Sequence, residues 1–298
     1  MDYKLTENIS IEKFIYELNL ISPDLLTIIN KQETIINTIC TPKKINPNSL
    51  CFTKDLISEN LNAVIITENK YLQSLPSESN NTYILTSNPR LIFILAIDIL
   101  YKQIGFQHFN FPSKIHPSVE CGENVVIEDG CIIEENVIIE HNTVIHKGTR
   151  IGKNSRIRAN TNIGGDGFGF ERLADGTPIR FQHLGGVIIG ENVEIGALNS
   201  IVRGTLSDTI IGNHVKTDNL VHIAHNCIIG NNCLITACAE FSGGITLGKN
   251  VWIGPNTSLM QKISIGDNSI IGLGAVVLKN VPENSIYAGN PAKFLKNV

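Results

Sequence analysis

Residues 211–234 read IGNHVK, TDNLVH, IAHNCI and IGNNCL, four successive blocks of six residues. The same period starts at Ile115 and resumes after interruptions at residues 165–186 and 201–210. Each of these four blocks opens on an aliphatic residue or threonine, and the glycines and asparagines that follow tolerate the positive φ of a sharp corner. Three blocks make one triangular coil, and stacked coils lie about 4.8 Å apart. We predict a left-handed parallel β-helix over residues 115–288.

The first 107 residues lack this period and mix helical with strand signals. Ser10 is the expected N-cap of a helix whose apolar face contains Ile11, Phe14, Ile15 and Leu18. Short β-branched runs predict strands over residues 34–38, 50–53, 63–67 and 82–85. Ser87 is the expected cap of a second helix, which has Pro89 in its first turn. We therefore expect a small α/β domain at 1–107, a linker at 108–114 and a short tail at 289–298.

Composition narrows the class of protein. A formal net charge of −4 over 298 residues, with no basic stripe, argues against a nucleic-acid binder. The longest apolar run, Leu91–Leu100, is about half of a membrane span and contains Asp98. The chain opens without the basic and apolar segments of a signal peptide, and its seven cysteines form no CxxC pair. We expect a cytoplasmic protein of about two domains without a membrane span.

His225 is the residue on which a chemical function would depend. It occupies the outward third place of IAHNCI, and counting by 18 puts Gly243 at the same corner one coil later. The same count puts Ser207 one coil earlier, although the irregular stretch RGTLSD disturbs it. An imidazole takes up protons near neutral pH, and a glycine leaves its backbone N–H open to a developing oxyanion. A solvated corner histidine is the alternative interpretation.

The interruption at 165–186 is too long for a corner and must loop out. It carries Phe168 and two further phenylalanines, so we expect it to pack on a neighbouring subunit or to cover a substrate. His183, where the loop rejoins the helix, is a candidate contact for a phosphate or a sugar. Asp218 and His222 precede His225 in the same segment, and we expect them to flank the base as candidates to hold the sugar or to orient the imidazole. Water-facing corner residues are the alternative for both.

Four segments together resemble the N-acyltransferase family that makes UDP-2,3-diacylglucosamine in lipid A synthesis: TDNLVHIAHNCIIG, VIIGENVEIGA, RGTLSDTIIGN and DGFGF. The resemblance covers most of the chain and implies that His225 is the general base and Gly243 N–H the oxyanion donor. It implies that the N-terminal domain binds the nucleotide, with Phe52 stacking on the base and Asn88 beside it. A core aromatic is the alternative for Phe52. The resemblance also implies a homotrimer with sites between subunits. We expect no metal, because a thioester is already activated.

Two features depart from that family. Lys262, in LMQKIS, replaces a second histidine near the pantetheine, and a lysine there is suited to a phosphate. The ending VPENSIYAGNPAKFLKNV is similar to that of coenzyme-A-dependent hexapeptide acyltransferases and differs from a helical extension that engages acyl carrier protein. On this resemblance Lys279, Asn290 and Lys293 are candidate coenzyme A contacts. A charged cap on the final coil is the alternative.

Together these features resemble the nucleotide-linked amino-sugar N-acyltransferases, including those of anthrose synthesis. We expect acyl transfer from acyl-CoA to the amine of a dTDP-amino-dideoxyhexose. UDP-3-O-acylglucosamine N-acylation from acyl carrier protein is the alternative. From another class, a zinc β-helix similar to carbonic anhydrase would need His141 and His146, for which no convincing third histidine lies upstream.

Overall fold

The computed structural model describes the whole chain except residues 1, 22–25, 43, 58 and 77. It divides into two compact units. The α/β unit contains Met1–His108 and Phe168–Gln182, and the β-helix unit contains Phe109–Gly167 and His183–Val298. The tip of the long loop is therefore part of the α/β unit.

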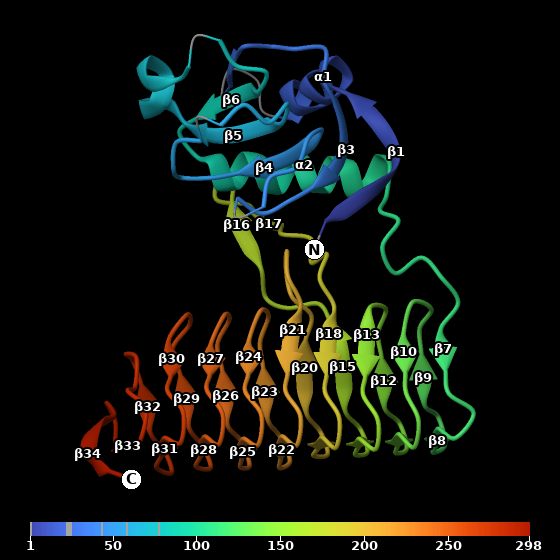
Figure 1. Cartoon of the computed structure of the whole chain (residues 1–298), viewed down its shortest axis with the longest axis vertical. Coiled ribbons are helices and arrows are strands. Elements are labelled where there is room, and N and C mark those ends of the chain that lie inside the picture. The colour runs from blue at the N-terminus through green and yellow to red at the C-terminus, as the bar shows by residue number, and fades with distance from the viewer. Residues whose placement is uncertain (1, 22–25, 43, 58, 77) are drawn as a thin grey trace. The chain divides into compact units, whose positions relative to one another are not determined.

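The α/β unit is built on a six-stranded sheet in the order β1-β3-β4-β5-β6-β2 (Figure 1). Its four central strands run parallel: β3 (Ile35–Ile39), β4 (Ser49–Phe52), β5 (Val64–Glu68) and β6 (Thr82–Thr86). Two antiparallel strands that were not predicted form its edges: β1 (Tyr3–Ser10) and β2 (Thr27–Ile29). The loop tip adds the hairpin β16 (Phe170–Arg172) and β17 (Pro178–Arg180).

Two α-helices and a short 3-10 helix, η1 (Asn69–Ser74), complete this unit. Helix α1 (Ile11–Ile21) buries the four apolar residues that were predicted to form its inner face, and Lys13 N donates to Ser10 Oγ at 3.3 Å. Helix α2 (Pro89–Gln103) begins one residue later than the predicted cap. Asn88, not Ser87, is its N-cap, because the Asn88 side chain accepts a hydrogen bond from Leu91 N at 3.1 Å.

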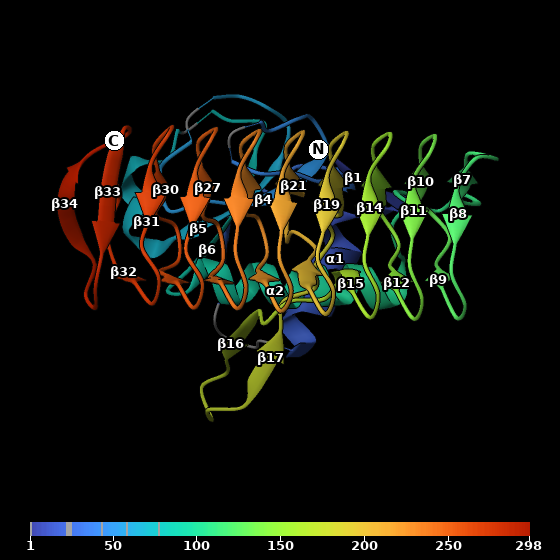
Figure 2. The same ribbon diagram turned by 90° about the horizontal axis from the view of Figure 1, so that it is seen from below.

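The second unit is a parallel β-helix with three faces, which confirms the predicted architecture (Figures 1 and 2). The first face contains β7 (Lys114–Ile115), β10 (Ile132–Ile133), β13 (Thr149–Ile151), β18 (Val187–Ile189), β21 (Thr209–Ile211), β24 (Ile228–Ile229), β27 (Thr246–Leu247) and β30 (Ser264–Ile265). The second face contains β8 (Glu120–Cys121), β11 (Ile138–Ile139), β14 (Arg156–Ile157), β19 (Glu194–Ile195), β22 (Lys216–Thr217), β25 (Leu234–Ile235), β28 (Trp252–Ile253), β31 (Ile270–Ile271), β33 (Ser285–Ala288) and β34 (Lys293–Asn297). The third face contains β9 (Val126–Ile127), β12 (Val144–Ile145), β15 (Asn162–Gly165), β20 (Ser200–Val202), β23 (His222–Ile223), β26 (Glu240–Phe241), β29 (Ser258–Leu259) and β32 (Val276–Val277).

The core of the β-helix is a stack of aliphatic residues, one from most strands, with small residues between them. Cys227 and Cys233 are fully buried in it, and burial raises the pKa of both thiols to about 11. The corners have the expected chemistry, since Asn142 and Asn268 have a φ of 57°. Such corners are easiest for asparagine and glycine.

Both short segments outside the predicted repeats make defined contacts. In the expected linker, Phe109 is 9% exposed, and its ring fills the space that β-carbons on Gly148 and Gly186 would need. In the expected tail, β34 pairs antiparallel with β33 and so extends the second face. The β-helix unit thus includes residues on both sides of the repeats.

Candidate active site

The corners at which the third face turns into the first face lie in a row along the β-helix, which we call the third–first edge. Strand pairing determines which side chains are stacked on this edge. Ile201 pairs with Ile223, which pairs with Phe241. The residues two places further on are therefore stacked on this edge: Arg203, His225 and Gly243. Counting by 18 also put Ser207 near this corner, and Asn226 Nδ2 donates to Ser207 Oγ there at 2.8 Å. On the third face RGTLSD lengthens the coil, so the residue in register with His225 is Arg203, 22 residues earlier.

The imidazole of His225 lies directly against the backbone of Gly243. A β-carbon on Gly243 would be 2.5 Å from Cε1 and 2.7 Å from Nε2 of the ring, so only glycine fits here. Backbone N–H groups at the third place point outward on other coils, where Asn213 N donates to Asn231 Oδ1 at 2.9 Å and Lys249 N to Asp267 Oδ1 at 3.0 Å. The Gly243 N–H has no such acceptor among the described residues. It can therefore donate to a ligand.

Asn226 determines which nitrogen of His225 carries the proton. The Asn226 Nδ2 donates to the backbone oxygen and Oγ of Ser207 at 2.9 and 2.8 Å, and its Oδ1 accepts from Thr205 N and Oγ1. The same Oδ1 lies 2.9 Å from His225 Nδ1. Because Oδ1 can only accept, this network assigns the proton of a neutral imidazole to Nδ1. The Nε2 lone pair is then free beside Gly243.

A second imidazole packs on the first. His183 is 5% exposed, and its ring centroid lies 5.6 Å from that of His225 with the rings 74° apart. At the other end of the long loop, a β-carbon on Gly167 would lie 3.1 Å from His183 Nε2 and 3.5 Å from His225 Cδ2. Both ends of the loop therefore lie against His225. His183, expected beside a phosphate or sugar, is buried against the candidate base.

Asp218 and His222 do not lie on the two sides of His225. His222 faces outward from β23, where it pairs with Ser200 and Glu240. Asp218 precedes the corner between the second and third faces, and its carboxylate accepts from Asn219 N at 2.8 Å. The third face separates Asp218 from His225. His222, on that face, is the one that lies towards His225.

The residues that are candidates to contact the acyl donor form two groups. Lys262 and Lys279 are exposed on the third–first edge, on the C-terminal side of Gly243, and Lys262 N donates to the Gly243 backbone oxygen at 3.0 Å. Asn290 and Lys293 are exposed where β33 turns into β34, at the end of the helix. The structure therefore places the two lysines, but not the second pair, on the edge that contains His225.

In the α/β unit, the candidate nucleotide contacts lie at the carboxyl ends of parallel strands. Phe52 ends β4 and is partly exposed, with its ring centroid 4.7 Å from that of Phe93. Asn88 follows β6 and is exposed, although its Oδ1 caps α2. Ligands of parallel sheets bind at this end of the strands. Phe168 is 90% exposed, and its ring centroid lies 5.0 Å from that of Phe170.

A family model described as bacterial transferase hexapeptide (six repeats) matches residues 130–165, 208–243 and 244–279. These segments contain His225 and Gly243. The β-helix is built of hexapeptide repeats.

Relatives of this hexapeptide-repeat protein are acyltransferases by name. It is 40% identical over 135 residues to the UDP-3-O-acylglucosamine N-acyltransferase of Campylobacter lari, covering 45% of this chain and 42% of that protein. It is 43% identical over 131 residues to the enzyme of the same name from Methylorubrum extorquens strain PA1, covering 44% and 37%. The chain thus spans less than half the length of these relatives. A crystal structure of a UDP-N-acetylglucosamine acyltransferase matches with a TM-score of 0.51 and 26% identity, over 62% of this chain and 71% of the other.

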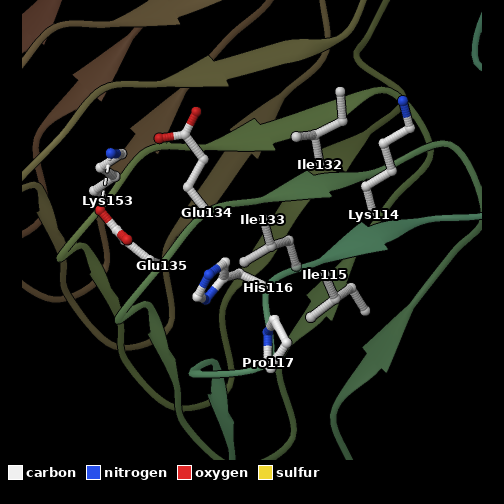
Figure 3. Close-up of a pocket in the computed structure, with 9 residues that line it drawn as sticks. All are labelled: Lys114, Ile115, His116, Pro117, Ile132, Ile133, Glu134, Glu135 and Lys153. Atoms are coloured by element: carbon white, nitrogen blue, oxygen red, sulfur yellow. Dashed lines mark ion pairs between the residues drawn. The ribbon is translucent and has the colours of Figure 1, made fainter.

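The hexapeptide-repeat protein has a separate hollow of about 450 Å³ at the N-terminal end of the β-helix (Figure 3). Lys114, His116 and Ile132 line it from the first face, and Lys153 and Glu135 form an ion pair of 2.8 Å at its rim. No residue of the His225 cluster lines this hollow. It therefore takes no part in the chemistry considered for His225.

The two histidines considered for zinc bind other groups. His141 Nδ1 accepts from Glu123 N at 2.8 Å, and His146 Nδ1 lies 3.0 Å from Glu128 Oε1 on a different edge. Among the described residues, no group of three or more histidine, cysteine or acidic side chains is close enough to hold a metal ion. In the same described part of the chain, no helix has the length and apolar content needed to cross a membrane.

Proposed function

We propose that this protein transfers an acyl group from a thioester to the amine of a nucleotide-linked amino sugar. The observation that carries the proposal is the arrangement of three residues: Asn226 holds Nδ1 of His225, and Nε2 lies against Gly243. A base and an oxyanion donor within one small site match the two demands of acyl transfer to an amine. The acyltransferase names of the relatives support the same reaction.

In the proposed mechanism the nitrogen of the sugar amine attacks the thioester carbonyl carbon. His225 Nε2 accepts a proton from that amine nitrogen. The carbonyl oxygen becomes an oxyanion, which accepts a hydrogen bond from Gly243 N–H. The C–N bond is then complete, and the C–S bond breaks as the oxyanion collapses. The thiolate takes the proton back from the imidazolium, so that an amide and a free thiol leave and the base is regenerated.

For the acceptor, the comparisons support the alternative over the first expectation. The curated relatives are named for UDP-3-O-acylglucosamine, and none of those described above is named for a dTDP-amino sugar. We therefore propose a UDP-linked acylated glucosamine as the first acceptor to test and keep the dTDP-amino-dideoxyhexose as the second. Phe52 and Asn88 are proposed contacts of the nucleotide, and His222 of the sugar.

For the donor, acyl-CoA and acyl carrier protein present the same phosphopantetheine thioester. Lys262 and Lys279 follow Gly243 along the third–first edge and suit phosphate groups. Asn290 and Lys293 remain proposed contacts further from the thioester. We also propose a homotrimer with sites between subunits, as the resemblance implies.

The test is to mix each acceptor with acyl-CoA or acyl carrier protein and to follow thiol release and the mass of the amide. His225→Ala should lower the rate about 10²–10⁴-fold, the usual contribution of a general base. His214→Ala is a matched control, because His214 is an exposed corner histidine on another edge. A rate for His225→Ala within a few-fold of the parent would remove His225 as the base.

A further inference from the structure

Two cations on the third–first edge have no part in the transfer step described above. Arg203 lies at the third place of the coil directly before His225, about 4.8 Å away along the helix axis. Lys147 lies two coils before Arg203, since Ile145 pairs with Ile163 and Ile163 with Ile201. Both are therefore on the N-terminal side of His225, whereas Lys262 and Lys279 are on the C-terminal side.

The guanidinium of Arg203 is incompletely bonded. Its Nη2 donates to the backbone oxygen of Lys147, whereas its buried Nε has no hydrogen-bond partner among the described residues. Within the described part of the chain, neither Arg203 nor Lys147 forms an ion pair. A buried charged donor without an acceptor is unfavourable, so an anion that supplied acceptor oxygens would stabilise this arrangement.

The carboxylate of Glu128, beside these two cations, is already hydrogen-bonded. Glu128 Oε2 accepts from Lys147 N at 2.8 Å, and its Oε1 lies 3.0 Å from Nδ1 of His146. Burial alone would raise the pKa of Glu128, but these hydrogen bonds lower it below its usual value, so the group is a carboxylate at neutral pH. Of Glu128, Lys147 and Arg203, two are cations and one is an anion, and the anion is already hydrogen-bonded.

The coil between the two cations has glycine at the third place. Gly165, whose backbone oxygen accepts from Arg203 N at 3.1 Å, has no side chain. A β-carbon there would be 2.6 Å from Asn162 Oδ1, so a larger residue would not fit without a shift. The edge from Lys147 to Arg203 is thus a short cationic strip that ends at His225.

We propose that Arg203 and Lys147 bind the diphosphate of the nucleotide-linked acceptor. A guanidinium binds two phosphate oxygens at once, and a lysine adds a second positive charge. In a nucleotide sugar the diphosphate is a few bonds from the amine, which suits a strip that ends beside the base. The acceptor then approaches His225 from the N-terminal coils and the acyl donor from the C-terminal coils. This inference rests on the proposed function.

The kinetic test uses Arg203→Gln and Lys147→Gln in the full chain. Each variant should raise the KM for the nucleotide sugar about 10-fold or more, with kcat and the KM for the acyl donor within about 3-fold of the parent. Arg203→Lys should restore part of the affinity. Arg150→Gln is the matched control, because Arg150 is an exposed arginine on the first face. An unchanged acceptor KM in both variants, or an equal rise for both substrates, overturns the proposal.

A binding test separates this inference from the proposed reaction. UDP, dTDP, inorganic pyrophosphate and uridine are titrated calorimetrically into the parent and Arg203→Gln proteins. The expected result is a loss of about 10-fold or more in affinity for the diphosphates and none for uridine, whether or not the protein transfers acyl groups. Equal affinity of both proteins for all four ligands overturns the inference, even if acyl transfer is found. If Arg203→Gln fails to fold, Lys147→Gln carries the same comparison.

Discussion

The ring of His225 occupies the space that a side chain at Gly243 would take, with Nε2 only 2.7 Å from the position of a β-carbon. This contact joins the candidate base of one coil to the candidate oxyanion donor of the next. It gives Gly243 two separable roles, since the residue must both lack a side chain and present its N–H.

Gly243→Ala tests the first role. The alanine keeps the backbone N–H but its methyl group overlaps the imidazole, so His225 must rotate away. We expect at least a 100-fold loss of acyl transfer, the size of loss typical when a base is removed. Steady-state rates and a thermal melt should be measured together. Full activity in a folded Gly243→Ala protein would show that the contact between the two residues is not needed.

Asn226→Asp tests the orientation of the base. Aspartate still accepts from His225 Nδ1 and tolerates the φ of 61° at this corner, but it cannot donate to Ser207. A negative charge 2.9 Å from the ring favours the imidazolium. The acidic limb of the profile of kcat/KM against pH should therefore move up by about one pH unit, the usual size of such an effect.

An unmoved profile for Asn226→Asp would show that Asn226 does not contact the titrating base. Asn231→Asp is a suitable control. Asn231 is a corner asparagine on another edge of the β-helix. Its Oδ1 accepts a hydrogen bond from Asn213 N and does not contact His225. That variant should leave the pH profile as in the parent.

Buried thiols predict how stability depends on pH. Folding raises the pKa of Cys227 and Cys233 from 9.0 to about 11, so the folded state favours their neutral forms. The stability that this provides is complete below pH 9 and is lost as the pH rises towards 11. In the native protein at pH 8, iodoacetamide should modify the exposed Cys238 and spare both buried thiols. Rapid labelling of Cys227 or Cys233 without unfolding would contradict the buried assignment.

The six-residue period predicted the β-helix because one apolar residue in each block must face a narrow core. The positions of the strands follow from the positions of those residues. The α/β unit was predicted less completely. The edge strand Tyr3–Ser10 alternates apolar and polar residues only as far as Thr6, and the polar residues Glu7 and Asn8 then break the pattern, so its strand signal was too short to use. Ser87 and Asn88 are both good capping residues. Only the backbone geometry shows that Asn88 is the cap.

The candidate site was predictable where the coil length is constant. Counting by 18 related His225 to Gly243 and to Ser207, but on the third face the coil that contains RGTLSD is 22 residues long. The count therefore missed Arg203. The roles of Thr205 and Ser207 depend on how that same excursion folds back on Asn226, which no local pattern specifies. The length of the excursion was the available signal, since four extra residues shift the register by four.

Lys262 and Lys279 provide the last prediction. Both are exposed on the C-terminal side of Gly243, where a thioester donor would extend its phosphates under the proposed function. The double change Lys262→Gln and Lys279→Gln should raise the KM for acyl-CoA about 10-fold and leave the KM for an acyl-pantetheine without phosphates unchanged. The parent's KM for acyl-CoA should also rise with salt, because exposed charges are screened. Lys249→Gln, an exposed lysine on another edge, is the control. If both donors lose affinity equally, the lysines shape the thioester site and do not bind phosphate.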